Sequence, residues 1–291
     1  IFYTSKYEVL EDFKAPKNRI AFPYYHGDPK REKKFFKLIS SIESNHKFID
    51  RIQVSQSYIE SIVLNTGIDE NKVHRIPIGI DINNFPFRND VDKINFRKEF
   101  NIPENAFLVG SFQKDGNGWG RGDEPKLIKG PDIFLETIKA LKTKIDNLTV
   151  LLTGPSRGYV KAGLEKLGVS YHHFNLNDYH EISKYYRMLD IYLITSREEG
   201  GPRAVFESMA SGIPLVTTKV GQAMDVVEHN RNGWMVDVGD VDGIVEFVTF
   251  IYENNLNLED VLYNARLTAE SNSYESQHLK WLDFMRGFVE F

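Results

Sequence analysis

Short apolar runs alternate along the chain with longer runs in which apolar residues recur every three or four positions. The short runs are rich in Val, Ile, Leu and Phe, which is typical of strands buried on both faces, whereas the longer runs predict amphipathic helices. Strands are predicted at 1–4, 19–23, 51–55, 72–77, 107–112, 148–154, 170–174, 190–196, 214–218 and 234–238. This alternation predicts an α/β fold with parallel sheets covered by helices.

Two changes in the pattern predict how the chain is divided. Residues 79–90 contain Gly, Pro and Asn without periodicity and predict a linker, after which the alternation restarts. The end has three helical stretches, at 240–253, 258–271 and 274–290, with no strand between them. Because the chain is long enough for two domains and begins on a strand-like run, we expect two domains and a missing amino-terminal part.

The composition and charge of the chain exclude several classes of protein and of site. The 291 residues are 41% apolar and 26% charged, which is typical of a globular chain. The net charge of −5 disfavours a general nucleic-acid binder, so we predict no nucleic-acid partner. The absence of cysteine excludes disulfides, thiolate metal sites and a Cys nucleophile. No apolar run is long enough to span a bilayer.

The segment 190–218 carries the clearest chemical pattern. A predicted strand ends in the polar loop SREEGG, and Pro202 suits the first turn of the helix that follows. Gly200 and Gly201 let backbone N–H groups approach a ligand closely. The helix start at Arg203 adds unpaired donors and a partial positive charge. This segment therefore predicts an anion site at the carboxyl end of parallel strands.

Two acidic residues lie on either side of this helix start, Glu199 in the loop and Glu207 within the helix. They are too far apart to be i,i+4 partners, so they are placed to contact two parts of an elongated ligand. The stretch 195–214 contains Glu-Gly from 199 and Glu-Ser-Met-Ala-x-Gly-x-Pro from 207, and it resembles the Glu-x7-Glu region of retaining nucleotide-sugar glycosyltransferases of family 4. The resemblance implies that Glu199 contacts donor-sugar hydroxyls and that Glu207 binds the nucleotide ribose. The alternative is a solvated loop acid and an ordinary helix N-terminal charge.

A second match has the spacing that this family requires. Lys129 and Gly130 open a helix after the strand at 107–112, and the resemblance implies that Lys129 holds the donor diphosphate. The alternative is a solvated lysine at a helix start. The family usually has Gly-Arg directly after this strand, whereas this chain has Gly110 and Ser111.

The loop 113–128 that follows is long and contains several cations. Lys114, Arg121 or Lys126 can supply the second positive charge, and the sequence leaves these three open. The glycines of the loop do not fit G-x-G-x-x-G, so we reject a dinucleotide fingerprint.

Weaker matches extend the resemblance over about residues 46–250. They imply a glycine turn at Gly154, a base-bordering segment at Asn175 and Leu176, and an Asn-Gly hairpin within 219–237. His26 follows a predicted strand, and the resemblance implies that it faces the reacting sugar; a structural histidine is the alternative.

No metal site is predicted. His172 and His173 are neighbours in a strand, so their side chains face opposite ways and cannot bind one metal. The sequence has no His/Asp/Glu cluster with metal-ligand spacing, and the family resemblance implies no bound metal or other cofactor.

The resemblance implies the GT-B fold, in which two Rossmann-like domains have parallel sheets that face each other across a cleft. Residues 1–85 plus 272–291 are expected to form an incomplete, acceptor-side amino-terminal domain. Residues 86–271 are expected to form the nucleotide-sugar-binding domain. The last helix is then expected to cross back onto the amino-terminal domain.

The implied reaction moves a sugar from a nucleotide-diphosphate sugar to a hydroxyl of a glycan or lipid-linked acceptor, with retention, in polysaccharide or glycolipid synthesis in the cytoplasm. We expect Glu199, Lys129 and His26 to be catalytic. The residues expected to bind the donor are Glu207, Gly200, Gly201, Pro202, Arg203, Ser111, Gly154, Asn175 and Leu176. The alternatives are a non-catalytic sugar-nucleotide-binding protein or truncated transferase, and a nucleotide-sugar epimerase or phosphorylase on the same fold.

The segment 30–42, KREKKFFKLISSI, is basic at its start and apolar afterwards. As a helix it can lie on an anionic membrane surface, which predicts peripheral contact at the inner membrane face. The alternative is an amphipathic helix packed on the amino-terminal sheet.

Overall fold

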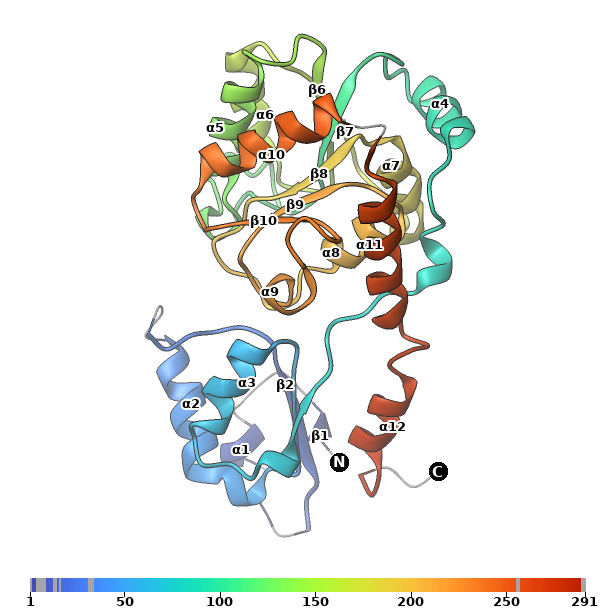
Figure 1. Cartoon of the computed structure of the whole chain (residues 1–291). Coiled ribbons are helices and arrows are strands. Elements are labelled where there is room, and N and C mark those ends of the chain that lie inside the picture. The colour runs from blue at the N-terminus through green and yellow to red at the C-terminus, as the bar shows by residue number, and fades with distance from the viewer. Residues whose placement is uncertain are drawn as a thin grey trace.

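The computed structural model describes residues 2–3, 9–12, 15, 17–30, 34–254 and 257–288, which form two α/β units (Figure 1). The smaller unit contains the amino-terminal strands and the larger one contains the strands that follow. Each unit is built on one sheet whose paired strands are all parallel. The predicted α/β fold with parallel sheets is confirmed.

The amino-terminal sheet has the strand order β1–β2–β3–β4. Its elements are β1 (Phe2–Tyr3), α1 (Val9–Asp12), β2 (Ile20–Tyr24), α2 (Lys34–Asn45), β3 (Arg51–Val54), α3 (Ser57–Leu64) and β4 (Val73–Arg75). Phe22 and Val54 pack with Ile42 of α2 and Val63 of α3, so the apolar faces of strands and helices form one core. Residues 1 and 4 of the strand predicted at 1–4 lie outside the described residues.

The larger sheet has the order β10–β9–β8–β5–β6–β7. Its strands are β5 (Phe107–Ser111), β6 (Leu148–Thr153), β7 (Ser170–Phe174), β8 (Ile191–Ile194), β9 (Leu215–Thr218) and β10 (Trp234–Val236). Its helices are α4 (Asp90–Glu99), α5 (Pro131–Leu141), α6 (Gly158–Leu167), α7 (Ile182–Met188), α8 (Arg203–Ala210), α9 (Ala223–Val226), α10 (Val241–Glu253) and α11 (Glu259–Ser271).

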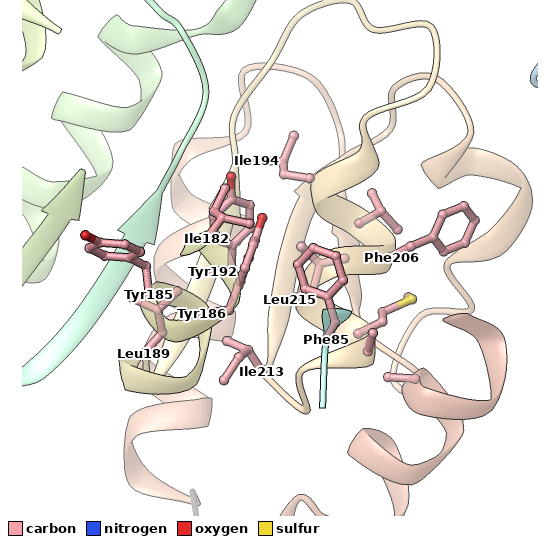
Figure 2. Close-up of a cluster of buried hydrophobic side chains, with 14 of the residues drawn as sticks. Phe85, Ile182, Tyr185, Tyr186, Leu189, Tyr192, Ile194, Phe206, Ile213 and Leu215 are labelled. Atoms are coloured by element: carbon pink, nitrogen blue, oxygen red, sulfur yellow. The ribbon is translucent and has the colours of Figure 1, made fainter. Parts of the chain in front are cut away.

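Helices cover both faces of this sheet. On one face, Ile138 of α5, Leu164 of α6 and Val248 of α10 share a core with the sheet. On the other face, α7, α8 and α11 enclose a second core, part of which Figure 2 shows with Tyr186 and Phe206. Because the strands are covered on both sides, they carry continuous apolar runs, as the sequence pattern predicts.

The order of the strands reverses between β5 and β8. From β5 the chain adds β6 and β7 on one side, and it then returns to place β8, β9 and β10 on the other. Open parallel sheets bind ligands outside the carboxyl ends of the strands at such a reversal. The segments that follow β5 and β8 are 112–130 and 195–202, which contain the predicted Lys129 and Glu199.

The predicted linker at 79–90 leads directly into a helix that the apolar pattern does not predict. Helix α4 lacks an apolar stripe, and the side chain of Asn89 caps it by accepting from the N–H of Asp92 at 2.8 Å. The helix is held instead by Arg97, which is buried and donates to the carbonyl of Met188 and to the carboxylate of Asp190. Polar tertiary contacts therefore stabilise this helix, and periodicity cannot find it.

The predicted Asn-Gly hairpin within 219–237 is wrong. A turn forms there, because the N–H of Asn230 donates to the carbonyl of Gly233 at 2.9 Å. However, β10 pairs with β9 in parallel, and α9 lies between them in sequence. An Asn-Gly pair predicts a local turn, but a hairpin also needs an antiparallel neighbour, which the sheet does not provide here.

Two segments run side by side between the units. Ile80 forms a parallel bridge with Ser273, and the side-chain amide of Gln277 donates to the carbonyl of Pro77 at 3.1 Å. Helix α12 (His278–Met285) lies beside the smaller unit (Figure 1) and is shorter than the predicted stretch 274–290. Its Phe284 packs against Ile76. The chain therefore crosses between the units twice at one place.

Helix α2 covers the later part of the segment 30–42. Ile42 is fully buried, and Leu38 and Ile39 pack against the amino-terminal core, while Phe36 stays exposed. This packing favours the amphipathic-helix alternative. Residues 31–33, which carry much of the positive charge of the segment, lie outside the described residues.

Candidate active site

The turn at 198–202 lies between β8 and α8 and contacts the smaller unit. A Cβ atom on Gly200 would lie 2.7 Å from the carbonyl oxygen of Tyr25, and one on Gly201 would lie 2.7 Å from the side chain of Ile78. Only glycine permits these close approaches. Pro202 is the N-cap of α8, and the helix begins at Arg203 as predicted.

Glu199 meets Lys129 beside this turn. The Nζ atom of Lys129 lies 2.5 Å from Oε1 of Glu199, and the hydroxyl of Ser196 lies 2.8 Å from the same oxygen. Gln113 completes the group, because its amide donates to the carbonyl of Lys129 at 2.7 Å and its Oε1 lies 3.0 Å from the Ser196 hydroxyl. Residues far apart in sequence thus form one polar cluster, of which Gln113 and Ser196 were not predicted.

Gly130 explains how Lys129 reaches this position. The residue has φ +62°, and a Cβ atom on it would lie 1.9 Å from the carbonyl oxygen of Thr195. The hydroxyl of Thr195 donates in return to the carbonyl of Gly130 at 2.9 Å. The Lys-Gly pair is therefore needed where the start of α5 packs against the end of β8.

We expect Gly130→Ala to lower the free energy of unfolding by roughly 2–4 kcal/mol, because the methyl group meets a backbone oxygen that cannot easily move. Gly168→Ala is the matched control: its φ is also +62°, but the added Cβ would lie 3.4 Å from its nearest neighbour, the flexible Nζ of Lys142. Urea denaturation measures both variants. Equal destabilisation of the two would show that the clash with Thr195 has no effect.

Glu207 lies apart from this cluster, inside α8. Only 4% of the residue is exposed, and its carboxylate accepts from the hydroxyls of Tyr179 and Tyr186, the latter at 2.9 Å. Burial raises the pKa of Glu207, and the two tyrosine hydrogen bonds oppose that rise. The guanidinium of Arg203 lies 4.6 Å from the centre of the Tyr179 ring. Tyr179, which is partly exposed, and the buried Tyr186 thus occupy the carboxylate in this structure.

A cavity of about 600 Å³ opens beside the Lys129–Glu199 pair. Its walls include His26 from the smaller unit, Gly200 from the turn, and Lys126 from the loop 113–128. A smaller cavity of about 40 Å³, between His26, Gln56 and Glu198, lies against the same turn. The structure therefore brings the three residues predicted as catalytic around one cavity between the two units.

Of the nine residues predicted to bind the donor, Gly200 alone lines this cavity. Gly201, Pro202, Arg203 and Glu207 do not line it, and neither do the four residues described next. Ser111 is buried at the end of β5, where Arg157 donates to its carbonyl at 2.7 Å. Gly154 has φ +82°, and its carbonyl lies 2.7 Å from Nε2 of His173. Asn175 lines a separate cavity of about 450 Å³, and Leu176 packs against the core beside α7 and α8.

Ser55 of the smaller unit and Gln222 of the larger unit both hold the turn in place. The carbonyl of Gly200 accepts from the hydroxyl of Ser55 at 3.0 Å and from the N–H of Gln222 at 3.1 Å. The side chain of Gln222 also accepts from the N–H of Ile78 at 2.9 Å. Ser55 and Gln222 are fully buried. The position of the turn thus depends on the packing of the two units, and periodicity along the chain gives no sign of these contacts.

Within the described ranges, no group of three or more His, Asp or Glu side chains could bind a metal ion. No helix in this same part of the chain is both long and apolar enough to cross a bilayer.

Comparison with known proteins finds similar sequences among glycosyltransferases. Residues 125–268 match the model of a family described as Glycosyl transferases group 1. The O-antigen biosynthesis glycosyltransferase WclY of Escherichia coli is 26% identical over 195 residues, which are 63% of this chain and 50% of that protein. The capsular polysaccharide biosynthesis glycosyltransferase CapM of Staphylococcus aureus is 24% identical over 238 residues, which are 78% and 58% of the two chains. This chain spans about half the length of the curated relatives that it matches.

Solved structures of other proteins have the same fold as this chain. Anabaena Alr3699/HepE in complex with UDP-glucose has a TM-score of 0.80 at 18% sequence identity, over 98% of this chain and 78% of the other. The same protein in complex with UDP gives a TM-score of 0.81. The likeness shows the GT-B fold, with two parallel sheets and a small amino-terminal one.

Proposed function

We propose, since residues 125–268 belong to the glycosyl transferases group 1 family, that this chain moves a sugar from a nucleotide-diphosphate sugar to an acceptor hydroxyl. One observation carries the proposal: Lys129 and Glu199 meet at 2.5 Å on the wall of a cavity of about 600 Å³ that His26 faces from the other unit. The cavity has the volume of a small-molecule binding site. On its wall, a lysine that can bind phosphate lies next to a carboxylate that can accept from sugar hydroxyls.

The difficult step is departure of the nucleoside diphosphate from a sugar carbon that becomes oxocarbenium-like, as in glycosidases. Lys129 and the backbone N–H groups at the start of α8 are placed to stabilise the growing negative charge on the diphosphate. Glu199 accepts hydrogen bonds from the sugar hydroxyls and orients the ring. Glu207 binds the ribose after Tyr179 has moved aside.

The proposed reaction retains the configuration at the anomeric carbon. The Glu-x7-Glu pattern of residues 199–207 supports retention. In this proposal Glu199 contacts the sugar hydroxyls and Glu207 contacts the ribose, so the two do not act as a glycosidase-like carboxylate pair. No metal or other cofactor enters the proposed step.

In the proposed reaction the two units bind different substrates. Residues 86–271 bind the donor, and residues 1–85 with 272–291 bind the acceptor and contribute His26. The names of the curated relatives, which concern O-antigen and capsular polysaccharide biosynthesis, support a glycan or lipid-linked acceptor in surface polysaccharide or glycolipid synthesis. The neighbouring structures with UDP and UDP-glucose make uridine diphosphate sugars the first donors to test.

The test is a thermal-shift screen with UDP-, GDP- and ADP-sugars, followed by a donor-hydrolysis assay with the sugar that binds. We expect one class of nucleotide sugar to raise the melting temperature and to be hydrolysed slowly. Binding without hydrolysis would favour the second candidate, a non-catalytic nucleotide-sugar-binding protein.

Peripheral membrane contact through residues 30–42 has its own test. The exposed Phe36 and the basic start of the segment support contact, while the buried Ile42 limits the apolar face that is available. Flotation with anionic liposomes should recover wild-type protein and lose the variant in which Lys30, Arg31, Lys33 and Lys34 are neutralised. Equal recovery of both would rule out electrostatic membrane binding by this segment.

A further inference from the structure

The charge balance around the large cavity is unfavourable for the donor that the proposed function requires. Glu124, Glu198 and Glu199 line it, against the lysines Lys126 and Lys129. Lys129 is already paired with Glu199 at 2.5 Å. The diphosphate of a nucleotide sugar carries two negative charges, so one lysine that must first leave a carboxylate is a weak anion site.

Most other cations near the site are committed to carboxylates of their own. Arg157 is fully buried and also donates to the Ser111 carbonyl, so it cannot turn toward the cavity. The committed pairs are Arg157 with Asp115, Arg197 with Asp132 and Lys219 with Asp237. The guanidinium of Arg203 lies over the Tyr179 ring.

The three cations of the loop 113–128 differ in their surroundings. The ammonium of Lys114 lies 3.7 Å from the centre of the Trp119 ring. Arg121 pairs with Asp123 and lines the separate cavity of about 450 Å³. Lys126 alone of these three lines the cavity that contains Lys129, and its side chain has no ion-pair partner within the described ranges.

A single backbone turn connects Lys126 and Lys129. Residues 127–129 form a single turn of 3₁₀ helix, closed by the N–H of Lys129 donating to the carbonyl of Lys126 at 2.8 Å. Lys126 is the N-cap of this turn, and both lysines line the same cavity. The N–H of Lys126 also donates to the carbonyl of Asp115 at 2.7 Å, and the buried Asp115–Arg157 pair anchors that loop to the sheet.

From this placement we propose that Lys126 and Lys129 bind the donor diphosphate together, so that Lys126 is a phosphate-binding residue of the site. The inference rests on the proposed function. When the diphosphate binds, Lys126 supplies the charge that Lys129 alone lacks, Lys129 leaves Glu199, and Glu199 becomes free to accept from the sugar. The loop 113–128 is therefore part of the donor site.

The test is calorimetric titration of the full chain with UDP, GDP and ADP. The diphosphate that binds best is then compared with its own monophosphate and nucleoside. We expect Lys126→Met to weaken diphosphate binding about tenfold or more, because one charge-assisted contact is lost, and to leave the nucleoside unchanged. A variant that merely disturbs the loop would weaken all three ligands alike.

Two variants serve as controls. Lys114→Met changes the same charge in the same loop and is expected to bind the diphosphate within about twofold of wild type, because a charge held away from the cavity is screened by solvent. Lys126→Arg keeps the charge and is expected to stay within about threefold.

Three results would overturn the inference while the proposed function stands: undiminished diphosphate binding by Lys126→Met, equal weakening of the nucleoside, or an equal loss in Lys114→Met. If wild-type protein binds none of the three diphosphates, the proposed function itself fails, and the inference fails with it.

Discussion

Replacement of Glu199 by Ala is expected to lower donor hydrolysis about a hundredfold while the nucleoside diphosphate still binds within about threefold of wild type. The carboxylate is the acceptor placed for sugar hydroxyls, so the variant should also lose the extra affinity for a nucleotide sugar over its diphosphate. Binding of the diphosphate should survive, because Lys129 loses its partner at 2.5 Å and is freed for phosphate. Titration with UDP-glucose and UDP, beside the hydrolysis rate, measures both effects.

Glu198→Ala is the matched control for this prediction. Glu198 precedes Glu199 and lines the same cavity, but the hydrogen bond that holds it in place is made by its backbone N–H, to the carbonyl of Ile128. We expect the rate of donor hydrolysis by Glu198→Ala to stay within about threefold of the wild-type rate, because this side chain lies outside the Lys129 cluster. If the two variants behaved alike, Glu199 would have no special role in binding the sugar.

Replacement of Glu207 by Gln is expected to weaken nucleotide binding at least about tenfold, because the ribose loses a charged acceptor. The melting temperature should stay the same or rise, because the amide keeps the shape of the side chain without a buried charge. Titration with the nucleoside diphosphate and a thermal melt test the two statements separately. Unchanged affinity would remove Glu207 from the donor site.

We also expect Glu207→Gln to change how the free energy of unfolding depends on pH. Burial raises the pKa of Glu207 from its ordinary value of 4.5, so folding favours the protonated carboxyl. The stabilisation from this group is fully present below pH 4.5 and is lost as the pH rises through the raised pKa. Glu207→Gln should remove this loss. Glu165→Gln, which affects an exposed carboxylate bonded to Tyr171, should leave the pH profile unchanged.

The sequence predicts the elements better than it predicts their contacts. All ten predicted strands are present in the described residues, apart from the end residues of the first. Most of them are buried on both faces and therefore carry continuous apolar runs, whereas β4 and β7 are only partly buried. Helix α4 has no apolar stripe and escapes such a pattern, since the buried Arg97 holds it through polar contacts. The hairpin predicted within 219–237 is wrong because strand pairing is decided across the sheet rather than within the turn.

In the candidate site, too, the sequence predicts residues better than it predicts their contacts. Glu199, Lys129 and the glycines around them are visible in the sequence because their local patterns are dense. Gln113 and Ser55 are ordinary polar residues in sequence, and only the fold brings them against Lys129 and Gly200. Glu207 was predicted as a ribose ligand from its motif, but its closure by two tyrosines follows from packing between α7, α8 and the turn before α7.

The sequence alone therefore determined the α/β class, the order of strands and helices, and the residue types available for phosphate and sugar. These properties depend on local periodicity and local chemistry. The tertiary structure decided which carboxylate is paired and which is buried, which loop lysine shares a cavity with Lys129, and how the smaller unit holds the turn at 198–202. These properties depend on contacts between residues far apart in the chain, and no short stretch of sequence encodes such contacts.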